Sequence, residues 1–117
     1  AFLGAWRETY PDGAVDTLDV WSMPLPEFDG AALEAKYAGL AGTPLTAVQS
    51  RAWAAIRALA ARFQRAEHLL FAVPMWNFSI PYRLKHLIDC VTQKDLLFTF
   101  DEQGLQGALT GRKAVLI

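Results

Sequence analysis

Cysteine is almost absent from this sequence: Cys90 is the only one among 117 residues. A single cysteine excludes an internal disulfide and a zinc site with several cysteine ligands, and it fits a reducing compartment, so we expect a cytoplasmic protein. Cys90 lies within an expected helix and is more simply a packed apolar side chain than a reactive thiol. His68 and His86 have no partner at a metal-ligand spacing, so we expect no metal site.

An excess of positive charge is also missing. Eleven Lys and Arg residues against twelve Asp and Glu residues give a formal net charge of −1. Without a basic field, nucleic acid is not an expected partner. No apolar run approaches the roughly 20 residues that cross a bilayer, and the start has no signal-peptide pattern, so we expect no membrane association.

The two ends of the chain resemble interior segments of a domain. The sequence begins without Met in a helix-like stretch and stops inside the apolar run 114–117. Hydrophobic residues make up 53% of the chain, which is enough for one core. We therefore expect residues 1–117 to be a single, partial domain, incomplete at both ends.

Expected strands alternate with expected helices along the chain. The strands are Val15–Val20, Leu69–Val73, a β-prone stretch at 96–100 and the run at 114–117, with a turn-rich excursion at 101–107. Four helices are expected: a stretch that ends at Pro11, a short helix capped by Asp29, one that begins with the capping box Thr46 to Gln49, and one that begins at Pro81. In the helix capped by Asp29, we expect Leu33, Tyr37 and Leu40 to face inward. This alternation predicts an α/β fold: a doubly wound parallel sheet with helices on both faces, and ligands bound beyond the carboxyl ends of its strands.

The loop that follows the most apolar strand is itself unusually apolar. Leu69–Val73 is a continuous apolar run, typical of a central strand buried on both faces, and the segment from Pro74 to Pro81 follows it. Two large aromatic residues around Asn77 suit a flat ligand such as an isoalloxazine ring, which needs apolar contact on its faces and hydrogen bonds at its edge. The other interpretation is that Trp76 and Phe78 fill a domain or dimer seam. The residues alone leave both open.

A family resemblance adds to this interpretation. The run Phe71–Pro81, continued by Leu84-Lys85 and Ile88-Asp89, resembles the signature of FMN-dependent NADH-azoreductases and related NAD(P)H quinone oxidoreductases, which have a flavodoxin-like fold. Further similar stretches are Pro44-Leu45-Thr46, Phe98-Thr99-Phe100 with Glu102 and Gly104, and the residues Gly107, Leu109, Gly111, Lys113 and Ala114.

The resemblance implies both an activity and a site. FMN would be bound by Met75, Trp76, Asn77 and Phe78, while Phe100 and, less directly, Phe98 would line the substrate pocket. Members pass hydride from NADH or NADPH through the flavin to quinones or azo compounds by ping-pong kinetics, act as homodimers and need no catalytic acid or base side chain.

The family pattern also has parts that residues 1–117 lack. Its Ser-rich phosphate loop and its Gly-rich flavin loop would lie outside this segment, so we expect the segment alone to be inactive. The alternative is a flavodoxin-like module without a cofactor, which binds a protein partner through its aromatic loop.

Overall fold

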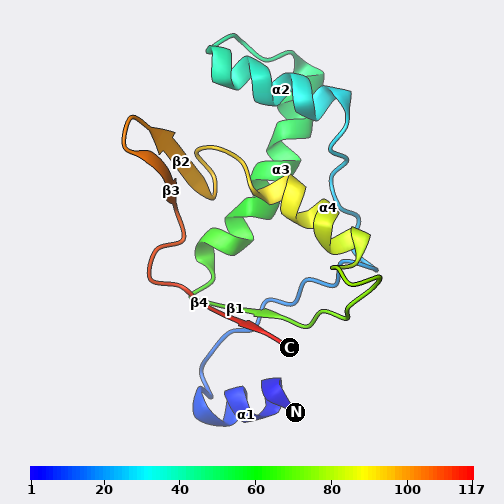
Figure 1. Cartoon of the computed structure of the whole chain (residues 1–117), viewed down its shortest axis with the longest axis vertical. Coiled ribbons are helices and arrows are strands. Elements are labelled where there is room, and N and C mark those ends of the chain that lie inside the picture. Colours follow the sequence, from blue (N-terminus) through cyan, green and yellow to red (C-terminus); the bar gives the residue numbers. More distant parts are fainter.

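The computed structural model describes residues 1–117. The elements in chain order are α1 (Phe2–Thr9), α2 (Gly30–Ala41), α3 (Ala47–Arg65), β1 (His68–Phe71), α4 (Tyr82–Val91), β2 (Phe98–Asp101), β3 (Gly104–Gly107) and β4 (Lys113–Leu116) (Figure 1). No helix is both long enough and apolar enough to cross a membrane.

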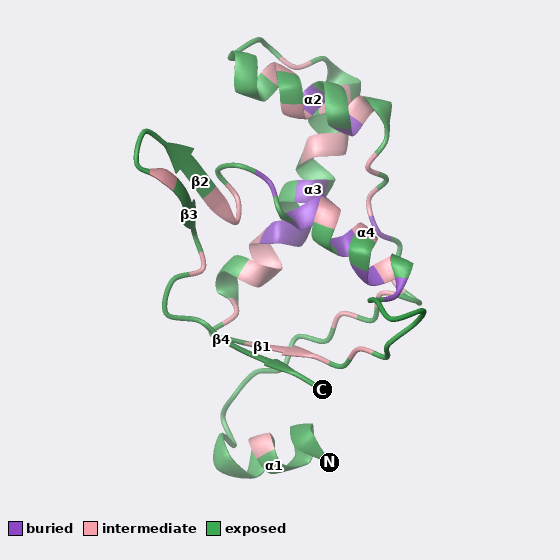
Figure 2. Ribbon diagram, in the orientation of Figure 1, coloured by how far each residue is buried: buried purple, intermediate pink, exposed green.

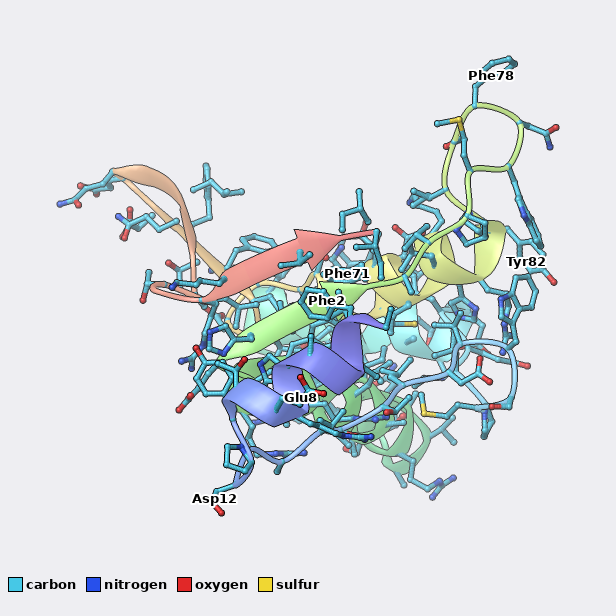
Figure 3. The ribbon with its side chains drawn as sticks, turned by 90° about the horizontal axis from the view of Figure 1, so that it is seen from below. Phe2, Glu8, Asp12, Phe71, Phe78 and Tyr82 are labelled. Atoms are coloured by element: carbon cyan, nitrogen blue, oxygen red, sulfur yellow. The ribbon has the colours of Figure 1, made fainter.

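The parallel pair β1 and β4 is the centre of the α/β architecture. His68 pairs with Lys113 and Phe71 with Leu116, and the pairing continues where the Val73 N–H donates to the Ile117 carbonyl at 2.9 Å. Helices α3 and α4 lie on one side of this pair and α1 lies on the other (Figures 1 and 3). The predicted combination of parallel strands with helices on both faces is thus confirmed.

Side-chain caps define where the helices start. The Thr46 hydroxyl accepts from the Gln49 N–H at 3.2 Å, and the Gln49 side chain accepts from the Thr46 N–H at 2.9 Å. The Asp29 carboxylate accepts from the Ala32 N–H at 3.3 Å at the start of α2. Because these groups satisfy backbone donors that have no partner within the helix, the polar side chains fix where α2 and α3 begin, as the sequence predicted.

The core lies where α3 and α4 meet the segment before α2 (Figure 2). Its buried members are Leu25, Leu59, Ala60, Leu84, Leu87, Cys90 and Val91. Cys90 is fully buried and packs as an apolar side chain, as expected. Burial, and secondarily the negative charge of Asp89, raise the pKa of its thiol to about 11, so the side chain stays neutral.

The expected inner face of α2 is wrong. Leu33, Tyr37 and Leu40 are exposed, and the residues that α2 buries are Ala32 and Ala35. Small side chains allow α2 to pack closely on α3, which leaves the bulky apolar residues on the outer side of the helix.

The predicted strand at Val15–Val20 is also wrong, because this extended segment forms no ladder with another strand. Arg62 of α3 holds it instead. The guanidinium donates to both Asp16 carboxylate oxygens, at 2.5 and 2.9 Å, and to the Thr17 carbonyl at 3.0 Å. Arg62 therefore ties this segment to α3.

Two further differences concern strands. The excursion at 101–107 contains β3, which pairs antiparallel with β2 in a hairpin apart from the parallel pair. Strand β1 is only partly buried, since a groove of about 210 Å³ lies between it and the extended segment that contains Leu18 and Val20. The expectation of burial on both faces therefore does not hold within these residues.

Candidate functional site

The loop between β1 and α4 contains a tight two-residue turn. Trp76 and Ser79 exchange both backbone hydrogen bonds, each at 2.9 Å. The two central residues are left-handed, with φ of 49° for Asn77 and 60° for Phe78. This combination is that of a type I′ turn, which normally takes Asn or Gly at both central positions.

A phenylalanine is costly at this place. For a side chain with a Cβ the left-handed conformation costs about 1–2 kcal/mol, and Asn tolerates it better than Phe does. Phe78 is nonetheless 99% exposed and Met75 is 75% exposed, so neither side chain gains from burial in the chain. Figure 3 shows Phe78 pointing away from the body of the molecule. Strain together with exposed apolar surface is typical of a ligand or partner site.

The backbone of the turn is open to a ligand as well. The N–H groups of Asn77 and Phe78 donate no hydrogen bond within the chain. They lie beside the exposed Met75, Trp76 and Phe78 side chains. Apolar surface next to free backbone donors is the arrangement that a flat heteroaromatic ring with a polar edge requires.

Trp21 joins this loop from a distant part of the sequence. Its ring centroid lies 5.3 Å from that of Trp76 at an interplanar angle of 38°, and 5.6 Å from that of Tyr82 at 83°. These distances are those of favourable aromatic pairs. Trp21, Trp76 and Tyr82, which we call the aromatic cluster, therefore make one continuous surface beside the turn.

One face of α4 fixes the segment that contains Trp21. Arg83 donates to the Val20 carbonyl at 2.8 Å and to the Met23 carbonyl at 3.0 Å. His86 Nε2 lies 2.8 Å from the Pro26 carbonyl, an acceptor only, so this nitrogen carries the proton. Residues three and four apart on a helix share a face, so Cys90 lies on the same face as Arg83 and His86. Its thiol donates to the same Pro26 carbonyl at 3.3 Å.

A turn built on Asp19 completes the support of Trp21. The Asp19 carboxylate accepts from the Trp21 N–H at 3.0 Å and from the Ser22 hydroxyl at 2.8 Å. The Trp21 N–H first, and then the Ser22 hydroxyl, hold the pKa of Asp19 below its ordinary value. An ionised Asp19 therefore stabilises this turn at neutral pH.

The sequence did not single out Trp21, Arg83 or Asp19. One signal was available: Pro24 and Pro26 prevent regular structure, which leaves the carbonyls of their segment without helix or sheet donors. Donor side chains follow at helical spacing in 81–91. The Arg83 contacts join residues about sixty positions apart, however, and no local pattern pairs them.

The structure brings only some of the predicted site residues together. Met75, Trp76, Asn77 and Phe78 form one exposed loop at the end of β1. Phe98 and Phe100 belong to the β2–β3 hairpin, which lies on the opposite side of the molecule (Figure 1). Within one chain, therefore, these two phenylalanines do not reach the loop. No group of three or more His, Cys, Asp or Glu side chains is placed to hold a metal ion.

Comparison with known proteins agrees with this architecture. The profile of the family described as flavodoxin-like fold matches residues 1–117. An FMN-dependent NADH:quinone oxidoreductase from Burkholderia lata is 56% identical over 117 residues, which are 100% of this chain and 56% of that protein. Another from Pseudomonas syringae pv. tomato is 51% identical over 98% of this chain and 55% of its own length.

Solved structures are similar too. The crystal structure of an azoreductase from Bacillus anthracis superposes with a TM-score of 0.87 at 26% identity, over 98% of this chain and 55% of that one. The chain spans about half the length of the curated relatives it matches.

Proposed function

Because this chain belongs to the family with the flavodoxin-like fold, we propose that it forms part of an FMN-dependent oxidoreductase that transfers hydride from NADH or NADPH to quinones or azo compounds. The observation that carries the proposal is the strained turn at Asn77 and Phe78, with its free N–H groups and exposed apolar side chains. Relatives named FMN-dependent NADH:quinone oxidoreductases and a structural neighbour named azoreductase support it.

The residues of the turn suit FMN. Met75, Trp76 and Phe78 offer apolar surface to the faces of an isoalloxazine ring, and the free N–H groups of Asn77 and Phe78 offer donors to its polar edge. The amide side chain of Asn77 is a further donor and acceptor on the exposed turn. Binding of a ring would also bury the apolar surface that the strained turn exposes.

When bound, FMN supplies the ability to accept a hydride from the nicotinamide cofactor and to release it to the second substrate. The residues of the loop bind and orient the reactants and exclude water. No acid or base side chain lies in the loop from Pro74 to Pro81, which is consistent with chemistry that needs none to begin. Since both substrates would use one pocket in turn, we expect ping-pong kinetics.

A homodimer would complete the substrate pocket. Phe98 and Phe100 lie on the side of the chain opposite the loop, so a second copy is the simplest source of a hairpin near the flavin. The exposed side chains of Leu33, Tyr37 and Leu40 on one face of α2 offer apolar surface to an interface between copies. The single free cysteine supports a reducing location such as the cytoplasm.

Steady-state kinetics of the protein expressed from its complete reading frame test the proposal. With FMN present, initial rates of NADH oxidation at several quinone concentrations should give parallel double-reciprocal lines. Trp76→Ala should weaken FMN binding by about tenfold, because it removes a large aromatic contact. Phe2→Ala on α1, a helix that buries no residue, is the matched control and should bind FMN normally.

The competing function would show itself in the same experiment. A module that binds a protein partner through its aromatic loop would neither bind FMN nor oxidise NADH. Finding neither activity in the complete protein would therefore contradict the proposal and favour a partner for the exposed Phe78.

A further inference from the structure

Trp21 is the one aromatic neighbour of Trp76 in the chain. Trp76 packs on the Trp21 ring at 5.3 Å and makes no side-chain hydrogen bond. Its own turn is closed by only two backbone hydrogen bonds, those with Ser79. These two bonds hold the backbone of the turn and do not set the orientation of the Trp76 ring, and the aromatic ring packed against it is that of Trp21.

Trp21, in contrast, has a firmly held backbone. Its backbone N–H donates to the Asp19 carboxylate, and Arg83 donates to the carbonyls of Val20 and Met23 on either side of it. The edge of its ring also packs against Tyr82, the first residue of α4. Shifting the backbone that carries Trp21 would break the charge-assisted hydrogen bonds of Arg83 to the Val20 and Met23 carbonyls, which are stronger than neutral ones.

We propose that Trp21 is a positioning residue of the flavin site: anchored to α4 through Arg83, it holds the Trp76 ring in the orientation that the turn presents to the ligand. This inference rests on the proposed function, because the ligand is the flavin. Trp21 acts through Trp76 and does not itself take part in the reaction. Arg83 acts one step further away, by fixing the backbone around Trp21.

Three substitutions at position 21 separate the role of the ring from mere packing. Trp21→Phe keeps an aromatic ring, Trp21→Leu keeps apolar volume without a ring, and Trp21→Ala keeps neither. These variants are made in the protein from the complete reading frame and titrated with FMN. The Leu and Ala variants should have a Kd about 3- to 10-fold higher than wild type, because one aromatic pair is usually worth that much binding free energy. The Phe variant should have a Kd near that of wild type. Phe2→Ala is again the control.

A measurement without FMN tests the positioning itself. Nuclear Overhauser contacts between the Trp76 ring protons and the backbone of its own turn, assigned in the NMR spectrum with Trp76→Phe, should change in the Leu and Ala variants and stay as in wild type in the Phe variant, because these contacts report the orientation of the ring and not the ring current of position 21. Unchanged folding is checked by far-ultraviolet circular dichroism. If the proposed function fails, wild type does not bind FMN, yet this spectrum still decides whether Trp21 orients Trp76.

Arg83 gives an independent check. Arg83→Gln should raise the FMN Kd in the same direction, and combining it with Trp21→Ala should add little, since both act on the same contact. Wild-type FMN affinity in Trp21→Ala, wild-type affinity in Trp21→Leu, or full additivity with Arg83→Gln would each overturn the proposal.

Discussion

Phe78 combines strain and exposure in one residue, so stability and binding should respond to it in opposite ways. Its φ of 60° is a conformation that glycine adopts freely, and the side chain makes no burial contact that would be lost. Phe78→Gly should therefore raise the free energy of unfolding by about 0.5–1 kcal/mol, after the entropy that glycine adds to the unfolded chain. The same change should weaken FMN binding.

Phe78→Ala is the matched control for this prediction. Alanine keeps the strained φ and removes the ring, so it should weaken FMN binding with little change in stability. Urea unfolding and FMN titration of the two variants check both statements. Equal stability of the Gly and Ala variants would show that the turn stores no strain at this position.

Cys90 should make stability depend on alkaline pH. Its thiol pKa is raised from about 9.0 to about 11 by burial in the core, so the folded state favours the neutral thiol. The stabilisation is fully present below pH 9.0 and is lost as the pH rises through about 11. The loss is on the order of 1 kcal/mol.

The difference in unfolding free energy between wild type and Cys90→Ala isolates this contribution. It should be constant from pH 7 to about pH 9 and shrink above that, measured by urea unfolding at each pH. A difference that stays constant to pH 11 would contradict a buried, neutral thiol. In the native state at pH 8 the thiol should also react with Ellman's reagent only as fast as the chain unfolds.

At the scale of elements, the turn before Trp21 depends on the charge of Asp19. The pKa of Asp19 is lowered by the Trp21 N–H and then by the Ser22 hydroxyl. The ionised carboxylate therefore stabilises the folded turn fully above pH 3.8, the ordinary pKa of the group, and this stabilisation is lost as the pH falls through the lower pKa of the folded state. The near-ultraviolet circular dichroism of the aromatic cluster should weaken over this acidic range.

Asp19→Asn is the control for this acid effect. Its amide oxygen still accepts from the Trp21 N–H but does not titrate, so the variant should keep its aromatic signal to lower pH than wild type. Asp19→Ala should lose part of the signal at every pH. Identical acid profiles of wild type and Asp19→Asn would argue against a role for the charge.

Elements with local signals were predictable from the sequence. The capping box at Thr46 and Gln49, the cap at Asp29 and the apolar run before Pro74 each place the start or end of an element through contacts within a few residues. The segment at Val15–Val20 has β-prone residues but no ladder partner, and a strand requires one. Local composition cannot supply that information.

The candidate site was predictable to the same extent. The exposed loop with Trp76 and Phe78 followed from its composition and from the family resemblance. The left-handed turn and the link from Arg83 to Trp21 did not, because the first depends on backbone geometry and the second on contacts between distant segments.

At the scale of the whole molecule, residues 1–117 form an open structure. The radius of gyration is 16.2 Å, whereas a compact chain of this length has roughly 13 Å. Only 12 of 117 residues are buried, and the groove beside β1 is open. Few buried side chains mean little hydrophobic stabilisation to set against the entropy of ordering the chain.

The isolated segment should therefore be marginally stable. We expect urea unfolding of residues 1–117 alone to give a free energy below the usual range of about 5–15 kcal/mol, and NADH oxidation to be absent. The protein from the complete reading frame should unfold at higher urea concentration. A segment as stable and as active as that protein would contradict this view of the molecule.

An FMN titration of the protein from the complete reading frame, followed by quenching of flavin fluorescence, decides whether the strained loop is a flavin site. We expect saturable binding of one FMN per chain at micromolar or tighter affinity, weakened by Trp76→Ala and unaffected by Phe2→Ala. Absence of saturable binding, or wild-type affinity in Trp76→Ala, would contradict the assignment of the strained loop as a flavin site.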